Sequence, residues 1–380
     1  MSNQIIFTEE QNMLLDTAMD FCARHSTVSL VRSRLADEQS LPAHVWQAIK
    51  ELGWCGITIP ESQGGLGLGF SELVPVLEAM GRHLMATPLA WSAIAAQTLV
   101  LAGSHDQQNT WLPKIATGTI ATMALVEPDG SWLLEQPAAT ATRQGDQLVL
   151  TGIKSFVQDA TIADVLLVSV LLNGQPRLVL LDKTMVPTHA LAREVVIDET
   201  RRSFQLDLEG ISVAATQLLP GSCFPEIEQW AMLLLSAEMA GGHASVLNLV
   251  IDYLKTRKQF DRYIGSYQAL KHPTVDILLG LEASRSHLYH AATMLDVGQP
   301  LDKVVAVRML KAVASEGFAF AGDRAIQFHG GFGFTFECDA QLYLRRALWC
   351  QHQFGDETHQ RGLLAPLLLD NVLAGDLAEV

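Results

Sequence analysis

A glycine turn directly after a helical pattern constrains this chain most. Residues 310–326 carry apolar side chains at three-to-four-residue spacing, which predicts a helix, and the segment 327–333 that follows contains Gly330, Gly331 and Gly333. Glycine has no Cβ, so the backbone can turn here and approach a ligand closely. A GxGxxG dinucleotide loop would follow a strand and open a helix, so the context disfavours that motif. A plain helix C-cap would explain the first two glycines but leaves the polar residues before them unexplained.

A second segment places cationic groups at the predicted end of another helix. Arg257, Lys258 and Arg262 lie together there, and arginine guanidinium groups bind anions well. Phe260 adds an apolar face, and the Gln268 amide can both donate and accept hydrogen bonds. The simpler alternative is a solvated basic helix end that complements the helix dipole. The two segments together favour a binding site for an anionic ligand.

Length and charge limit the function classes. The chain has 380 residues, 49% of them hydrophobic and 18% charged, which is typical of a globular protein with two or three domains. The net charge of −15 argues against nucleic acid as a partner. An anionic ligand therefore needs a local cluster of Arg and Lys.

Cysteine use and hydropathy bear on location. The five cysteines are odd in number and lack Cys-x-x-Cys spacing, so they are interpreted as reduced thiols of a cytoplasmic protein, and no metal site is predicted. Residues 2–11 lack a signal-peptide pattern. The apolar runs 88–103 and 230–235 are too short or too interrupted for a membrane span, so we expect buried helices there.

Hydrophobic periodicity divides the chain into helical, β and helical parts, an α+β class. In the first part, Thr8 and Gln11 predict a capping box, and Ser71 is a candidate N-cap. Short β-rich runs follow, and a breaker at His272-Pro273 interrupts the last helical part. The predicted strands cover residues 147–150, 165–172 and 177–181.

With their flanks, the two motifs resemble the acyl-CoA dehydrogenase family. That family has a Gln-x-x-Gly-Gly-x-Gly turn, a Thr-x-Glu pair and an Arg-Asp-Ala triplet. The matching residues here are Gln327, Gly330, Gly331, Gly333, Thr335, Glu337, Arg345, Arg346 and Ala347. The resemblance covers essentially the whole chain. It implies an N-terminal helical domain (1–120), a middle β-barrel or sandwich domain (121–222) and a C-terminal four-helix bundle (223–380).

The resemblance also implies a cofactor, a substrate and partners. Family members use FAD to oxidise the Cα–Cβ bond of an acyl-CoA thioester and pass the electrons to an electron-transferring flavoprotein. In the family, the two motifs contact the adenosine-diphosphate half of a flavin held mainly by the neighbouring subunit. The residues expected to bind that half are Arg257, Phe260, Gln268, Gln327 and Gly331.

Positions expected near the flavin ring depart from the family pattern. Val126 stands where a threonine hydroxyl is usual, and Phe156 and Gln158 replace the ends of a Trp-x-Thr motif. The loop after Pro128 is also one residue short. Phe156 can still stack on a ring, and backbone groups can replace a hydroxyl, so flavin binding stays an expectation.

The catalytic base is also replaced. In most members a glutamate follows the Arg-Asp-Ala triplet, and here that position is Phe354, whose ring cannot accept a proton. Asp356 and Glu357 lie nearby, but their expected role is to cap the last helix. Asp252 is the one carboxylate in the segment 245–258, where some relatives carry the base. No catalytic residue is assigned.

Two hypotheses remain open from the sequence. In the first, the chain is an acyl-CoA dehydrogenase subunit that is itself catalytic, as a homo-oligomer. In the second, it is a non-catalytic, cofactor-sharing subunit of a heteromer whose homologous partner carries the glutamate. Family members that act on bulky substrates include such pairs. The length and branching of the acyl chain are not predicted.

Overall fold

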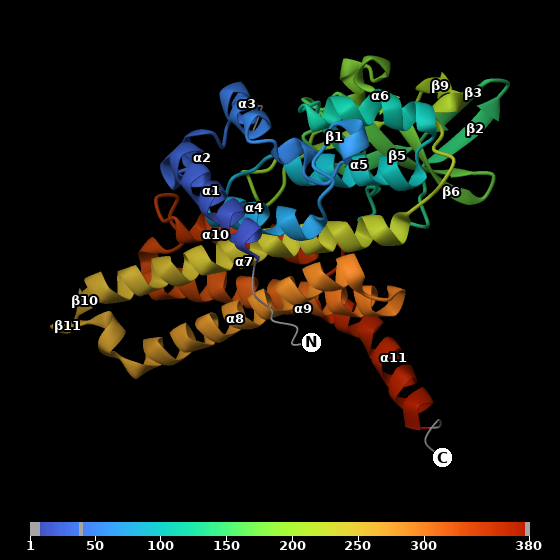
Figure 1. Cartoon of the computed structure of the whole chain (residues 1–380). Helices are drawn as coiled ribbons and strands as arrows, with labels where there is room; N and C mark the ends of the chain where they lie inside the picture. The colour runs from blue at the N-terminus through green and yellow to red at the C-terminus, as the bar shows by residue number, and fades with distance from the viewer. Residues whose placement is uncertain (1–7, 38–40, 377–380) are drawn as a thin grey trace. The chain divides into compact units, whose positions relative to one another are not determined.

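The computed structural model describes residues 8–37 and 41–376, and its first part is helical (Figure 1). The predicted capping box is present, because Gln11 N donates to Thr8 Oγ1 and Thr8 N donates to Gln11 Oε1, both at 3.1 Å. The helices of this part are α1 (Glu9–His25), α2 (Val28–Ser33), α3 (Ala43–Glu51), α4 (Phe70–Arg82), α5 (Leu89–Ala102) and α6 (His105–Ala116).

The described residues pack into two compact units. Unit 1 contains residues 8–32, 74–85 and 232–376. Unit 2 contains residues 33–37, 41–73 and 86–231. The changes of element type fall at Ala121, where β1 begins, and at Phe224, where α7 begins. The three-domain division of the sequence stays a prediction.

Unit 2 holds two β-sheets. One has the strand order β1-β5-β2-β3-β9, with β6 paired to β5, and the other has the order β4-β8-β7. The pair β1–β5 is parallel, whereas β5–β6 is an antiparallel hairpin that turns at Asn173-Gly174. The strands are β1 (Ala121–Ala124), β2 (Thr140–Gln144), β3 (Gln147–Thr151), β4 (Ile153–Gln158), β5 (Val165–Leu172), β6 (Gln175–Asp182), β7 (Leu191–Arg193), β8 (Ser203–Asp207) and β9 (Ser212–Ala214).

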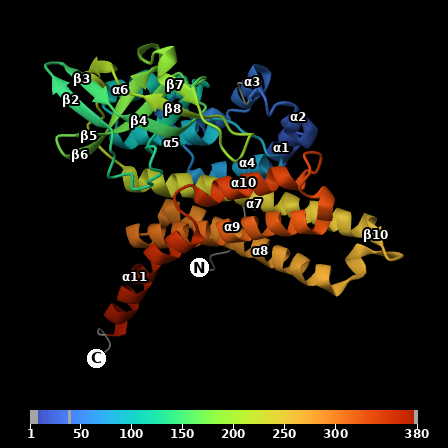
Figure 2. The same cartoon turned by 180° about the vertical axis from the view of Figure 1, so that it is seen from behind.

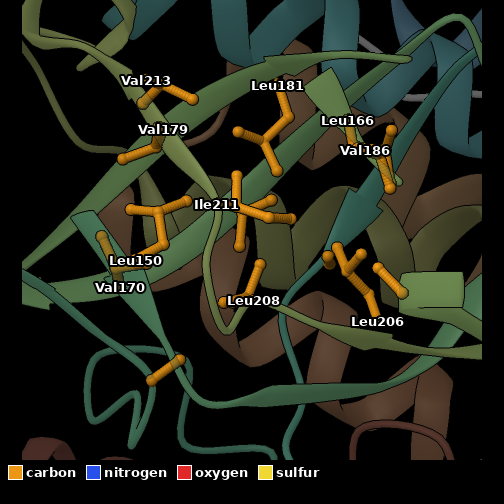
Figure 3. Packing of buried hydrophobic residues seen from close by; sticks show 14 of the residues in the cluster. Leu150, Leu166, Val170, Val179, Leu181, Val186, Leu206, Leu208, Ile211 and Val213 are labelled. Carbon is orange, nitrogen blue, oxygen red and sulfur yellow. The ribbon is translucent and has the colours of Figure 1, made fainter. Parts of the chain in front are cut away.

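The core of unit 2 lies among these strands. Side chains from both sheets and from the β8–β9 connection gather there, including Leu166, Leu206 and Ile211 (Figure 3). The first six residues of β5 are all buried, which explains its uninterrupted apolar sequence. This confirms the predicted β domain, with the strand at 165–172 in its predicted place.

Unit 1 is built on long helices. Figures 1 and 2 show α7 to α10 side by side, with α11 leaving the bundle, and this confirms the expected C-terminal helical bundle. A two-stranded hairpin joins α7 to α8. The elements are α7 (Phe224–Thr256), β10 (Lys258–Gln259), β11 (Arg262–Tyr263), α8 (Gln268–Val297), α9 (Pro300–His329), α10 (Ala340–His352) and α11 (Glu357–Asp376).

Glycines let two helices of unit 1 cross closely. An ideal Cβ on Gly81 of α4 would lie 2.1 Å from the Glu238 carbonyl oxygen, and one on Gly241 of α7 would lie 1.9 Å from the Glu78 carbonyl oxygen. No side chain fits at either position.

In the described residues, α7 alone is long and apolar enough to cross a membrane, but 72% of its most apolar window is buried, as in a core helix.

Two local predictions were wrong. Helix α4 begins at Phe70, so Ser71 is not its N-cap, and the Gly69 N–H instead donates to Glu72 Oε2 at 3.0 Å. Pro273 does not interrupt the helical structure but lies inside α8. It removes one backbone hydrogen bond near the start of a 30-residue helix, and that loss is small against the packing of the rest.

Candidate functional site

The two sequence motifs meet at one end of unit 1. The ring of Tyr253, in the last turn of α7, stacks on the ring of His329 at the end of α9, with 4.0 Å between the ring centroids. Arg257 follows Tyr253 by one helical turn, and Gln327 precedes His329 by two residues. Segments about 70 residues apart in sequence are thereby held beside each other (Figure 1).

The hairpin tip presents an aromatic ring to solvent. Phe260 and Asp261 form the turn between β10 and β11, with φ of 51° and 59°. Positive φ at both central residues defines a type I′ turn, for which Asn and Gly are strongly preferred. A phenylalanine in this conformation is strained, and its side chain is 87% exposed. Strain and exposure together suggest that this ring serves binding, because neither helps the fold.

The glycine turn separates structural from accessible positions. A Cβ on Gly333 would lie 2.2 Å from the Ile326 carbonyl oxygen, so the fold itself requires that glycine. A Cβ on Gly331 would meet no atom within 4 Å, so its backbone is open to a ligand. Gln327 is exposed beside it, and its amide makes no side-chain hydrogen bond to any described residue.

Arg257 and Gln268 are likewise exposed at this end of unit 1. Within residues 8–37 and 41–376, neither side chain has an ion pair or hydrogen bond. This end of unit 1 therefore offers hydrogen-bond donors suited to phosphates, namely an unpaired guanidinium and two unengaged amides. It also offers an aromatic face on which a planar base can stack, and an open glycine. We call Arg257, Phe260, Gln268, Gln327 and Gly331 the nucleotide surface.

Unit 2 brings together the residues expected beside a flavin ring. Val126 pairs with Ser155, whose N–H donates to the Val126 carbonyl at 2.7 Å, and this places Phe156 next to the pair. Phe156 has a φ of 57°, and its N–H donates to Glu194 Oε2 at 2.9 Å. Gln158 is buried, and its amide donates to the Phe156 carbonyl at 3.3 Å. Its side chain is therefore already engaged within unit 2.

Phe354, which the family resemblance aligns with the usual base, lies in the loop between α10 and α11. Phe354 has a φ of 58° and is 2% exposed. The Gln360 side-chain amide donates to its carbonyl. Asp356 caps α11, because its Oδ1 accepts the His359 N–H at 2.8 Å. Glu357, in the first turn of α11, accepts a hydrogen bond from Gln351 at 2.9 Å.

Sequence comparison identifies the family. The chain matches the acyl-CoA dehydrogenase N-terminal domain over residues 8–119 and the C-terminal domain over residues 229–369. The acyl-CoA dehydrogenase FadE12 of Mycobacterium tuberculosis is 30% identical over 314 residues, which cover 78% of this chain and 80% of FadE12. The chain belongs to the acyl-CoA dehydrogenase family. Its members are oxidoreductases that act on CH–CH bonds.

Other acyl-CoA dehydrogenases are similar over nearly the whole chain. IpdE2 of Mycobacterium tuberculosis is 29% identical over 343 residues, 89% of this chain and 91% of IpdE2. The solved ChsE4-ChsE5 complex of Mycobacterium tuberculosis matches with a TM-score of 0.85 and 25% identity, covering 99% of both chains. The solved Tcur3481-Tcur3483 steroid acyl-CoA dehydrogenase matches with a TM-score of 0.86 and 27% identity, covering 96% and 99%.

The sequence analysis missed two lysines of this chain. Lys154 of β4 is fully buried, and its Nζ contacts Glu127, Ser169 Oγ at 2.8 Å and the Leu125 carbonyl at 3.3 Å. Burial lowers the Lys154 pKa, while the bond to Glu127 opposes that shift. The Glu127 carboxylate also accepts the Ala138 N–H at 3.1 Å, so this buried pair anchors the short loop after Pro128.

The second buried lysine fixes the loop that carries Phe354. Lys311 of α9 is fully buried and donates to Ser315 Oγ at 2.8 Å, the Gln351 carbonyl at 2.9 Å and the Gly355 carbonyl at 2.8 Å. Its three N–H groups are thus all used. Burial lowers the Lys311 pKa to about 8. No local sequence pattern marks either lysine, because their partners lie far away in the sequence.

The buried carboxylates of the bundle are not free bases. Glu78 Oε1 accepts from Arg285 at 2.7 Å, and Glu238 Oε2 lies 3.5 Å from Arg346. Asp252, the carboxylate considered in the sequence, is exposed on α7. The buried carboxylates of Glu78 and Glu238 are therefore each paired with an arginine.

The family uses FAD, and the residues present fit part of that cofactor well. The nucleotide surface offers unengaged donors and an open glycine for the adenosine-diphosphate half. In unit 2, Val126 is apolar and Gln158 is engaged, so Phe156 and backbone groups carry the fit to the flavin ring. Ser155 Oγ is buried with no hydrogen-bond partner among the described residues, a polar group still available there.

Proposed function

We propose that this chain is a cofactor-sharing subunit of a FAD-dependent acyl-CoA dehydrogenase whose general base lies on a homologous partner subunit. The single observation that carries the proposal is Phe354, a buried ring at the position of the usual base. The reaction removes a proton from Cα of an acyl-CoA thioester as a hydride leaves Cβ. FAD, when bound, accepts that hydride.

The loop geometry supports the absence of a base in this chain. Lys311 and Gln360 fix the backbone carbonyls of Gly355 and Phe354, so the loop does not readily present another side chain at the same position. Asp356 and Glu357 are engaged in capping and in a hydrogen bond to Gln351. Loss of a general base costs about 10²–10⁴-fold in rate, so this chain needs a partner to turn over efficiently.

The nucleotide surface supports a role toward the neighbouring subunit. Arg257 would bind a phosphate oxygen, Phe260 would lie against the adenine, and the backbone at Gly331 would allow close approach. Gln268 and Gln327 would complete the polar contacts. The chain thereby contributes the adenosine-diphosphate contacts of a cofactor whose ring serves the partner's active site.

Two solved relatives support a heteromeric assembly, since the ChsE4-ChsE5 and Tcur3481-Tcur3483 proteins are each named for two components. We propose the same arrangement here, in the cytoplasm, with an acyl-CoA substrate and electron transfer to an electron-transferring flavoprotein. All five cysteines are free and buried, in keeping with a reducing compartment. The alternative is a homo-oligomeric dehydrogenase, which needs another carboxylate in place of the one lost at Phe354.

The visible spectrum of bound flavin tests the proposal. The chain would be purified alone and together with a co-expressed homologue that carries a Glu-Gly-Thr loop, and acyl-CoA would be added to each without an electron acceptor. We expect rapid bleaching in the co-expressed assembly only. A yellow chain that acyl-CoA bleaches without any partner would establish the homo-oligomeric enzyme instead.

A second arm assigns the base to one chain. Changing the glutamate of the partner's Glu-Gly-Thr loop to glutamine should abolish bleaching of the assembly. Changing both Asp356→Asn and Glu357→Gln in this chain should leave the bleaching rate within about twofold. If the double variant bleaches at least 100-fold more slowly while the partner variant does not, the base lies in this chain and the proposal is wrong.

A further inference from the structure

Unit 1 contains a pocket that the proposed function does not use. It lies between the end of α7, the β10–β11 hairpin and the start of α8, and has a volume of about 480 Å³. This falls within the ~300–1,000 Å³ range of small-molecule sites. Tyr263 of the hairpin lines the pocket, and none of the five residues of the nucleotide surface does. The pocket is therefore distinct from the nucleotide surface.

The walls of the pocket are apolar. Ile251 and Leu254 line it from α7, Val275 lines it from α8, and the Tyr263 ring lines it from the hairpin. Val275 and Tyr263 are each about half exposed, so apolar area faces solvent here. Covering such area with an alkyl chain is favourable because it removes the area from water.

The charged lining of the pocket has one sign. Lys255 of α7 and Lys271 of α8 both line it, and no Asp or Glu does. Neither ammonium group has an ion pair or a side-chain hydrogen bond within the described part of the chain. In a protein with a net charge of −15, these two lysines place cationic charge beside one apolar pocket.

The pocket is also remote from the loop of the usual base. Tyr253, near the pocket end of α7, stacks on His329 at the end of α9, whereas Lys311, which holds the Phe354 loop, lies about 27 Å earlier along α9. A ligand in the pocket therefore does not reach the loop that carries Phe354.

We propose that this pocket binds a fatty carboxylate, with the head group between Lys255 and Lys271 and the alkyl chain against Ile251, Leu254 and Val275. Charge-assisted hydrogen bonds from the two ammonium groups hold the carboxylate. The apolar walls bind the alkyl chain in proportion to the apolar surface that the chain buries. Affinity therefore rises with chain length until the pocket is full. Because a buried methylene contributes about 0.8 kcal/mol, the expected gain is about fourfold per methylene from octanoate to dodecanoate.

Isothermal titration calorimetry on the protein in its purified assembly tests the proposal, with dodecanoate as the probe. We expect one saturable site for each copy of this chain. The double variant K255A/K271A should bind at least about tenfold more weakly. The control variant K114A/K303A, with the same change in net charge at lysines outside the pocket, should bind within twofold of wild type. Dodecyltrimethylammonium, which has the same tail and a cationic head, should show no saturable binding.

A second variant tests the alkyl part of the site separately. V275W fills the pocket but keeps both lysines, so it should abolish dodecanoate binding while circular dichroism stays unchanged. Equal affinity of wild type and K255A/K271A would overturn the carboxylate assignment. Retained binding in V275W, or no saturable binding to the wild-type assembly, would overturn the pocket as the site.

Discussion

Single residues decide most of what this chain can do, and they act through distant partners. Phe354 is a buried ring at the position where the family resemblance leads us to expect a proton acceptor, and the Arg257 guanidinium makes no ion pair with any described residue. The sequence drew attention to both residues because their motifs are contiguous, and their roles stay predictions. The buried lysines were not predicted, because their partners lie elsewhere: Lys154 reaches Glu127, 27 residues earlier, and Lys311 reaches Gly355, 44 residues later. No local pattern of residues marks such a pair.

Lys311 is expected to stabilise the Phe354 loop. In the variant Lys311→Met, the carbonyls of Gln351 and Gly355 lose their donor inside the protein, which costs about 2–3 kcal/mol of unfolding free energy. Lys303→Met on the same helix should change it by less than about 0.5 kcal/mol. Urea unfolding and hydrogen exchange of residues 353–357 measure the two effects. Equal stability of the two variants would show that Lys311 does not hold the loop.

His243 is expected to give the bundle an acid-sensitive step. Burial lowers its pKa to about 4, and the positive charge of Arg285 acts in the same direction, while the hydrogen bond to the Ile277 carbonyl at 2.8 Å opposes the shift. Between about pH 6.5 and 4 the unfolded histidine binds a proton that the folded one does not, so stability falls as the pH falls through this range.

The variant His243→Gln isolates this step. The stability difference between wild type and variant should be constant above pH 7. Relative to the variant, the unfolding free energy of the wild type should fall by up to about 3 kcal/mol between pH 7 and pH 4. His105→Gln, at an exposed position, should follow the wild type throughout, as measured by urea unfolding at several pH values. A difference that does not change with pH would refute the assignment to His243.

Secondary-structure elements were largely predictable, and the exceptions have local causes. The strand at 165–172 was predicted at its observed position because an apolar run ends at Asn173-Gly174, whose positive φ values make the hairpin turn. Pro273 was misjudged because the cost of a proline near the start of a helix is small against the packing of a long helix. The convergence of the two motifs depends on α7 and α9 running parallel, so that both helices end at the same end of unit 1, and sequence periodicity does not give this arrangement.

The crossing of α4 and α7 should not tolerate a methyl group. Gly241→Ala places a Cβ against the Glu78 carbonyl, a backbone atom that moves only with its helix, and should cost about 3 kcal/mol or more. Gly362→Ala on α11 meets no atom within 4 Å and should instead stabilise the helix by about 0.5–1 kcal/mol. Thermal unfolding compares the two, and similar melting temperatures would contradict the close packing.

The strained hairpin turn is expected to lower the stability of the protein, while its exposed ring contributes to FAD binding. Replacing Phe260-Asp261 with Asn-Gly suits the positive φ values and should stabilise the protein by about 1 kcal/mol, but it removes the exposed ring. The assembly should then retain less FAD on gel filtration. Asp261→Gly alone relieves part of the strain and should retain the cofactor. If the double variant retains FAD as well as wild type does, Phe260 has no role in binding.

At the scale of the whole molecule, one end of unit 1 presents cationic side chains without ion pairs among the described residues, in a chain with a net charge of −15. Arg257 and the lysines beside the pocket are available there to ligands from outside the chain. The loop after the C-terminal end of α10 carries the buried ring of Phe354. We propose on this basis that the chain is one half of a cooperating pair, which contributes binding groups to its neighbour and depends on that neighbour for the general base.

The most direct test of this account measures how much FAD the assembly keeps when Arg257 is changed. The co-expressed assembly would be prepared with this chain as wild type, Arg257→Met or the control Arg143→Met, and the flavin-to-protein ratio read from its absorbance after dilution and gel filtration. The account predicts that Arg257→Met weakens FAD retention about tenfold or more while the control matches wild type, with both variants fully assembled. Equal flavin content in all three assemblies would contradict the central claim that this end of the chain binds the cofactor of its neighbour.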